Sequence, residues 1–117
     1  MKKIYFYLFT VICCASISAQ NEASFWYFGN NAGVRFNADN GSVTALTDGQ
    51  LNTLEGCTTI SDENGNLLFY TDGRSVWARN HQIMPNGNYN ANTGLLGDPS
   101  STSSGLIVPK PESTDEF

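Results

Sequence analysis

Three oxygen-bearing side chains alternate in one short polar segment and come nearest in spacing to a metal site. Asp62, Asn64 and Asn66 occupy positions 1, 3 and 5 of a calcium loop, where a hard cation takes carboxylate and carbonyl oxygens. An EF-hand loop also needs Gly at position 6 and Glu at position 12, but Leu67 and Gly73 stand there. The Asn-Gly pair inside this segment favours a two-residue hairpin turn with positive φ at both residues. We therefore expect a turn, with calcium as the alternative, and no resident cofactor.

No combination of residues predicts catalysis. His81 is the only histidine, so a histidine metal site or a catalytic triad has no partner that the sequence identifies. Residues 97–101 contain serine without the following glycine that a nucleophile elbow requires. Glycoside chemistry depends on the separation of two carboxyl groups in space, which a sequence does not give. We interpret the acidic candidates as turn and surface residues: Glu55, Asp62 and Asp72.

Aromatic residues suggest a binding surface for sugars. Trp26, Tyr27 and Trp77 could form a platform whose flat rings stack on pyranose rings while Asn and Asp side chains bind hydroxyl groups. Core packing is the alternative, because strand alternation turns Phe25 and Tyr27 to one side and Trp26 and Phe28 to the other. Trp26, Tyr27 and Trp77 are the candidate ligand-binding residues, and no catalytic residue is assigned.

The N-terminal segment is typical of an export signal. Lys2 and Lys3 form a positive n-region, residues 4–15 are an almost unbroken apolar run, and Ala19 supplies a small residue for signal peptidase. This run is shorter than the roughly 20 residues of a membrane-spanning helix, and no small residue precedes its cysteines as a lipoprotein signal requires. We predict a Sec-type signal peptide over residues 1–19, cleaved after Ala19 by the secretion machinery, and a secreted or cell-surface location.

Charge narrows the classes of partner. Of the 117 residues 15% are charged and the net charge is −5; because Lys2 and Lys3 are the only charged residues of the signal, the remainder carries −7. Such a surface repels phosphate backbones and anionic lipid headgroups. We expect no nucleic-acid binding and no membrane binding after signal cleavage.

Cys57 is the one cysteine that remains after cleavage at Ala19. A single cysteine forms no internal disulfide, and no cation or histidine lies near it in sequence to lower the pKa of its thiol. We predict that Cys57 is a small buried apolar residue.

Short β-branched and aromatic runs between tight turns predict an all-β, antiparallel β-meander over residues 20–84. A loop rich in Asn, Gly, Ser and Pro follows over 85–104, and a last strand at 106–108 with a polar tail completes residues 105–117. The expected strands of the meander are 24–28, 34–36, 42–46, 57–61, 67–71 and 75–78. No stretch holds apolar residues at helical spacing, so no long helix is expected.

A short repeat lies inside the meander. Asn40-Gly41 followed by Thr47-Asp48-Gly49 recurs 24 residues later as Asn64-Gly65 followed by Thr71-Asp72-Gly73. The residues between the turns share only strand propensity, so duplication and common turn rules both explain the match. Stacked meanders of this kind build propeller blades.

Four segments, 25–33, 53–62, 64–73 and 76–87, resemble the start of large secreted proteins of Bacteroidetes (Flavobacteriia-like). The resemblance covers nearly all of the chain after the signal. It implies a β-propeller of the WD40/YVTN type, of which this chain holds the first one to two blades and is incomplete. In that family a type B sorting domain of the type IX secretion system, associated with gliding motility, follows far downstream.

Three functions follow from these features. The first is an exported, non-catalytic binding or adhesion scaffold at the cell surface, the N-terminal fragment of a larger propeller protein, with a polysaccharide or a surface protein as partner. The second is a fragment of a propeller enzyme acting on polysaccharide, with Arg74, Arg79 and His81 as the available polar residues. The third is a small secreted domain that completes its sheet with a partner at an open edge, for example at Val76.

Overall fold

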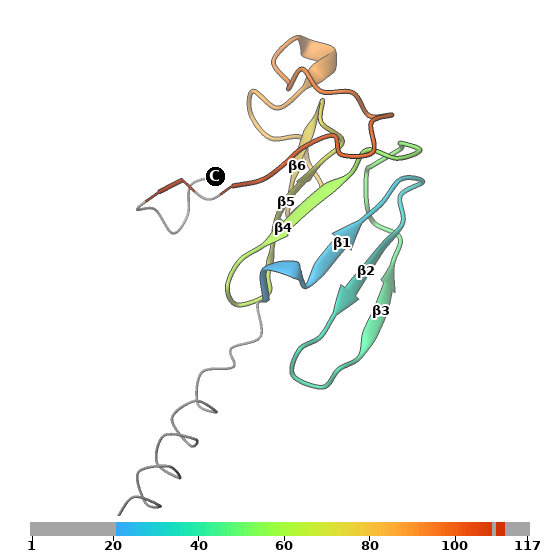
Figure 1. Ribbon diagram of the computed structural model, residues 1–117, viewed down its shortest axis with the longest axis vertical. Helices are drawn as coiled ribbons and strands as arrows, with labels where there is room; N and C mark the ends of the chain where they lie inside the picture. The colour runs from blue at the N-terminus through green and yellow to red at the C-terminus, as the bar shows by residue number, and fades with distance from the viewer. Residues whose placement is uncertain (1–20, 109, 112–117) are drawn as a thin grey trace, which may run out of the picture.

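Six short strands form two antiparallel three-stranded sheets (Figure 1). The computed structural model describes residues 21–108 and 110–111, so the predicted signal peptide lies outside the described residues. Each sheet is a meander in which consecutive strands pair, with orders β1-β2-β3 and β4-β5-β6. The strands are β1 (Phe25–Tyr27), β2 (Gly33–Phe36), β3 (Val43–Leu46), β4 (Thr58–Ser61), β5 (Leu67–Thr71) and β6 (Val76–Ala78). The all-β prediction is confirmed.

Helix is confined in the described residues to two single turns of 3-10 helix, η1 (Asn21–Ala23) and η2 (Tyr89–Ala91). The Asn88 side chain caps η2 by accepting a hydrogen bond from the Asn90 N–H, and Asn92 ends it in the left-handed conformation at φ 58°. Neither of these helices has the length to cross a membrane. The described residues therefore agree with the prediction of no long helix.

The β4–β5 hairpin turns in a different way from the one predicted. Of the Asn64-Gly65 pair only Gly65 has positive φ, at 78°, so the two-residue turn with positive φ at both residues is wrong. The Gly65 N–H donates to the Asp62 carbonyl (2.9 Å) and the Asp62 N–H to the Asn66 carbonyl (2.8 Å). This is a three-residue loop, a type I turn followed by a left-handed residue. The Asp62 carboxylate selects it by accepting from the backbone N–H groups of Asn64 and Asn66 (2.9 and 2.8 Å).

The core lies between the two sheets. The Tyr27 ring of β1 stacks on the Tyr70 ring of β5, with centroids 4.6 Å apart, and Tyr70 stacks in turn on Trp77 of β6 at 5.7 Å. Leu51 and Leu67 complete the buried apolar cluster. The first strands of the two meanders, β1 and β4, lie side by side (Figure 1), and the Tyr27 N–H donates to the Thr59 hydroxyl at 3.0 Å. One aromatic stack therefore holds the two sheets together.

The outer edges of β3 and β6, the last strands of the two sheets, differ in whether other residues pair with them. Residues 82–87 cover the edge of β6: the Val76 N–H donates to the Gly87 carbonyl (2.9 Å) and the Ala78 N–H to the Gln82 carbonyl (2.9 Å). The expectation of an open edge at Val76 is therefore wrong. Among the described residues none pairs with the outer edge of β3. The open edge lies at β3.

The polar loop predicted over residues 85–104 is attached to the β5–β6 turn. The Leu95 N–H donates to the Arg74 carbonyl (2.7 Å), the Gly97 N–H donates to the Gly73 carbonyl (2.8 Å), and the Arg74 guanidinium lies over the Tyr89 ring. The strand predicted at residues 106–108 is not formed, and none of the strands in the described part of the chain pairs with this segment.

The two copies of the short repeat occupy different places in the fold. The first ends after β3, the outermost strand of its sheet, and the second ends after β5, the central strand of the other sheet. Asp48 of the first copy accepts a hydrogen bond from the Tyr27 hydroxyl, whereas Asp72 of the second accepts from the backbone N–H groups of Arg74 and Ser75. The match therefore extends neither to equivalent strands nor to equivalent contacts of the two aspartates.

Candidate functional site

One face of the first sheet is entirely apolar. Trp26, Val34 and Ala45 are directly opposed across the three strands, and Phe36 is opposed to Val43, so these side chains share one side of the sheet. Phe28 lies two residues beyond Trp26 on the same side, with ring centroids 6.4 Å apart. We call this surface the outer face; its residues are Trp26, Phe28, Val34, Phe36, Val43 and Ala45.

The outer face is open to solvent. Trp26 is 49% exposed, Phe36 43% and Val43 60%. The Trp26 and Phe36 rings meet edge to face at 6.1 Å, and the Trp26 indole N–H donates to the Ala23 carbonyl at 2.8 Å. These contacts fix the orientation of the rings while leaving them half uncovered. Contiguous exposed apolar surfaces are uncommon on soluble proteins, which makes the outer face the candidate surface for an interaction.

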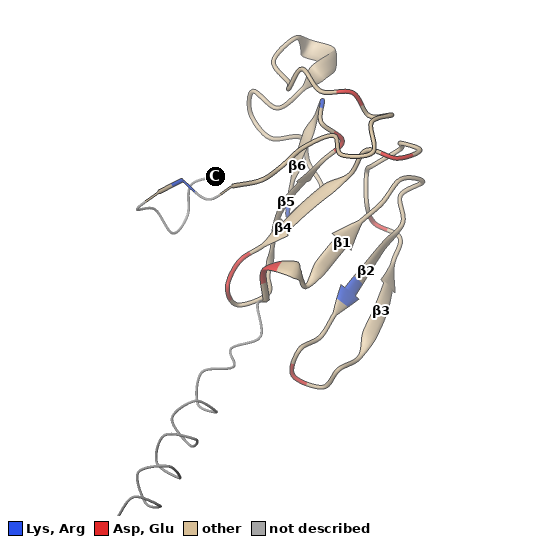
Figure 2. Cartoon of the chain, viewed as in Figure 1, with Lys and Arg blue, Asp and Glu red and all other residues tan. Residues whose placement is uncertain are grey.

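Charge is absent from the outer face. Among the six described strands Arg35 of β2 is the only charged residue (Figure 2). Its side chain lies on the opposite side of the sheet, with the guanidinium 5.1 Å from the centre of the Phe25 ring. No charged side chain therefore interrupts the apolar surface.

Two hollows adjoin the outer face. A groove of about 570 Å³ runs between β1 and β4, and the residues that line it include the apolar Trp26, Phe28 and Ile60 as well as Glu22, Thr58 and Thr59. A smaller hollow of about 120 Å³ lies beside Phe36, where Asn37 supplies a polar side chain. The larger hollow continues the surface of Trp26, and half of the residues that line the smaller one have polar side chains.

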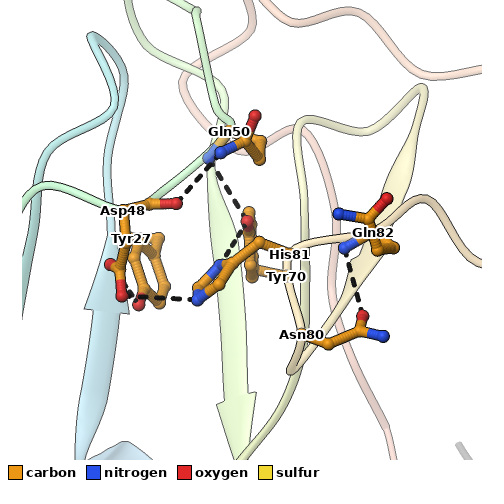
Figure 3. Close-up of polar contacts among 7 residues, drawn as sticks. All are labelled: Tyr27, Asp48, Gln50, Tyr70, Asn80, His81 and Gln82. Atoms are coloured by element: carbon orange, nitrogen blue, oxygen red, sulfur yellow. Dashed lines mark hydrogen bonds and ion pairs between the residues drawn. The ribbon is translucent and has the colours of Figure 1, made fainter.

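A polar cluster joins the two sheets on the other side of β1 (Figure 3). The Tyr27 hydroxyl donates to Asp48 Oδ1 (2.9 Å), and Asp48 Oδ2 lies 3.4 Å from His81 Nε2. His81 Nδ1 lies 2.9 Å from the Tyr70 hydroxyl, which also accepts from the Gln50 N–H at 3.2 Å. Since the Gln50 N–H donates to the Tyr70 hydroxyl, the hydroxyl proton is free to point at His81 Nδ1.

The contacts of this polar cluster are typical of a structural role. Burial raises the pKa of both phenols, and for Tyr27 the neighbouring Asp48 raises it further, so both hydroxyls stay protonated at neutral pH. Tyr70 is fully buried, and both ring nitrogens of His81 are occupied by Tyr70 and Asp48. Both nitrogens of the imidazole ring therefore contact residues of this cluster, which joins the two sheets.

His81 itself is held in the left-handed conformation, at φ 61°. Its N–H donates to the Ala78 carbonyl (2.8 Å), and the Asn80 side chain accepts from the Gln82 N–H at 3.1 Å (Figure 3). His81 thus stands in its turn where Gly65 stands in the β4–β5 hairpin. A non-glycine residue at positive φ carries a backbone cost, which here accompanies the two contacts of the imidazole ring.

The three predicted ligand-binding aromatic residues do not form one platform. Tyr27 is buried in the core and Trp77 is half-buried, stacked on Tyr70. Trp26 points to the outer face, where Phe36 and Phe28 are its neighbours. The core interpretation holds for Tyr27, and only Trp26 of the three remains a surface candidate.

The calcium candidate and Cys57 are both placed by local contacts. The Asp62 carboxylate faces nitrogen donors, including the Asn66 side-chain amide at 3.0 Å, and these hydrogen bonds hold its pKa below the usual range. The described residues contain no group of three His, Cys, Asp or Glu side chains able to hold a metal. Cys57 is half-buried against the core, and burial raises the pKa of its thiol.

Two parts of the site are not predicted from the sequence: the outer face and the contact between Asp48 and His81. The outer face has a readable signal, because Val34 and Phe36 alternate with polar or small residues, as do Val43 and Ala45. The pairing of Asp48 with His81 has none, since 33 positions separate the two residues and only the packing of the two sheets brings them together. A comparison with family models, curated proteins and solved structures found no match to this chain.

Proposed function

We propose that the chain is an exported, non-catalytic binding scaffold of the cell surface, and that the outer face of the first sheet is its binding surface. The observation that carries this proposal is the composition of that face, from Trp26 to Ala45: six apolar side chains, without a charged or polar one among them. Burial of such a surface against a partner releases water from apolar groups, which is the main driving force of association. Export is proposed from the signal-like residues 1–19.

The partner that fits best is another polypeptide with an apolar β-sheet face. A sugar site pairs an aromatic platform with polar side chains that bind hydroxyl groups. The outer face offers Trp26 and Phe36 but continues into Val34, Val43 and Ala45, which offer a hydroxyl group no hydrogen bond. Two sheets that pack face to face interdigitate side chains of this type.

The finer fold proposal is that the two meanders are the first blades of a propeller. Two features support it: the first strands, β1 and β4, lie side by side, and the third strands, β3 and β6, are the outermost of their sheets. Successive blades around a common axis have this arrangement. In a propeller the outer face packs on a neighbouring blade, so the partner surface has the same chemistry whether further chain or a separate protein supplies it.

The proposal of no catalysis rests on the tyrosine–histidine cluster. His81 is the only histidine, and its two nitrogens contact the buried Tyr70 hydroxyl and the Asp48 carboxylate. The cluster thus ties β1 and the segment after β3 to the second sheet.

The proposed binding is tested with the fluorescently labelled full chain and intact producing cells. We expect binding that is lost when the cells are treated with protease and retained when their sugars are oxidised with periodate. Phe36→Ser should weaken binding by at least about fivefold, since loss of an anchoring aromatic contact at an interface costs more than about 1 kcal/mol. The matched control is Leu54→Ser, which removes a side chain that is 93% exposed and lies outside the outer face.

Three results would contradict the proposal. Binding that is lost after periodate and kept after protease makes the partner a polysaccharide. Equal binding by Phe36→Ser and Leu54→Ser places the binding surface elsewhere. If the full chain binds neither untreated nor treated cells, this surface has no scaffold function.

A further inference from the structure

The open edge of β3 presents unpaired backbone groups. The Asn37 N–H donates to the Ser42 carbonyl at 2.9 Å, which makes Asn37 and Ser42 a hydrogen-bonded pair of the β2–β3 ladder. Because such pairs alternate along an antiparallel ladder, Thr44 also bonds to β2, whereas Val43 and Ala45 turn their N–H and C=O groups away from it. No described residue meets these outward groups. The edge therefore offers two donors and two acceptors to another strand.

The β3 edge lacks the features that prevent an edge strand from pairing with a strand of another chain. Proteins usually protect an edge strand with a charged residue, a proline, a bulge or a covering segment. Residues 42–46 are Ser-Val-Thr-Ala-Leu, without charge or proline, and the β2–β3 register runs without a bulge. The edge of β6, by contrast, is covered by residues 82–87. We infer that the β3 edge pairs, antiparallel, with the same edge of a second copy of the chain.

The register on this edge is complementary to itself. With a two-fold axis at Thr44, Val43 of each copy lies opposite Ala45 of the other, and each such pair exchanges two backbone hydrogen bonds. Thr44 then faces Thr44 of the second copy, and Thr–Thr is a favourable cross-strand pair. Ser42 faces Leu46, so no like charges oppose each other along the paired strands. This self-complementarity is what favours a second copy over an unrelated strand.

Pairing at β3 extends the outer face. The two first sheets become one six-stranded sheet in the order β1-β2-β3-β3-β2-β1. Val43 and Ala45 of both copies lie on the same side of it, so the two outer faces become continuous. The inference goes beyond the proposed function and does not depend on it, because the edge uses the backbone groups of Val43 and Ala45 whereas the outer face uses their side chains.

Charge near the edge predicts how salt acts on the pair. Asp39 and Asp48 lie in the segments that flank β3, so each copy has carboxylates near both ends of the paired strand. Both copies are also net negative. Salt screens such repulsion over a distance of about 10 Å at 0.1 M. We expect the dimer to tighten when the salt concentration is raised from 50 to 500 mM.

Cysteine cross-linking tests the register directly in the full chain with Cys13, Cys14 and Cys57 replaced by serine. The Cα atoms of directly opposed, non-hydrogen-bonded residues lie about 4.5 Å apart, which a disulfide can bridge. Thr44→Cys should therefore form a disulfide-linked dimer under mild oxidation. Ala45→Cys is the matched control. Position 45 of one copy faces Val43 of the other, so the two introduced cysteines are not directly opposed and lie further apart. We expect at least a tenfold faster cross-link for Thr44→Cys than for Ala45→Cys.

A proline variant tests the hydrogen bonds. Ala45→Pro removes an N–H that points away from β2, so the β2–β3 ladder keeps its bonds. Sedimentation should find the natural chain dimeric and Ala45→Pro monomeric, with the same circular dichroism. Equal cross-linking at positions 44 and 45, or a natural chain that is monomeric and fails to cross-link as Thr44→Cys, overturns the inference. If Ala45→Pro does not fold, the comparison of the two cysteine variants decides alone.

Discussion

Removal of the Tyr70 hydroxyl tests whether the polar cluster between the two sheets stabilises the fold. In Tyr70→Phe the ring keeps its stack on Tyr27 and Trp77, with centroids at 4.6 and 5.7 Å, so the apolar packing is unchanged. The hydroxyl contacts to His81 Nδ1 (2.9 Å) and the Gln50 N–H (3.2 Å) are lost. Both hydrogen bonds are part-buried, and at about 0.5–1.5 kcal/mol each their loss costs about 1–3 kcal/mol of the free energy of unfolding.

Urea unfolding followed by far-UV circular dichroism measures this cost. A small protein has an m-value of about 1–3 kcal/mol/M, so a loss of about 2 kcal/mol lowers the midpoint by about 1 M. Tyr89→Phe is the matched control, because Tyr89 is exposed and its ring, not its hydroxyl, contacts Arg74. Its midpoint should stay within the range of a neutral surface substitution, about ±0.5 kcal/mol. Equal midpoints for Tyr70→Phe and the natural chain would refute this role of the cluster.

Four further outcomes are expected. Since burial raises the pKa of Tyr27 and Tyr70, the unfolded chain ionises first; stability should be level up to about pH 10 and fall above it, as urea midpoints between pH 8 and 11 will show. Gly49→Ala places a methyl group 2.6 Å from the Tyr27 ring and should cost about 1–3 kcal/mol in thermal unfolding. Asp62→Ala removes the acceptor for two backbone N–H groups of its hairpin and should cost about 0.5–1.5 kcal/mol by the same assay. Mass spectrometry of the exported chain should find Gln20 at its N-terminus.

The strands of the meander could be predicted because local rules determine them. Aromatic and β-branched runs bounded by Asn-Gly and Asp-Gly turns mark where each strand begins and ends. The expected strand at 42–46 is observed as Val43–Leu46, and the expected strand at 67–71 is observed as Leu67–Thr71. Strand propensity alone was insufficient at 106–108, because a strand also needs a neighbour with which to pair.

The errors concern contacts that the local sequence does not contain. The Asp62 carboxylate captures two backbone N–H groups and selects a three-residue loop over the two-residue turn expected from Asn-Gly. The edge at Val76 is covered by a segment that carries no strand signal. Alternation correctly separated Tyr27 from Trp26, but it does not reveal that Trp77 joins Tyr27 through Tyr70.

Fluorescence of Trp26 in the bound state tests whether the outer face is the binding surface. In a Trp77→Phe chain Trp26 is the only tryptophan, and at 49% exposed it should be quenched efficiently by acrylamide when the chain is free. On chains bound to producing cells, we expect a blue-shifted emission and strong protection from acrylamide. Bound chains whose Trp26 emission and quenching equal those of the free chain would contradict this role of the outer face.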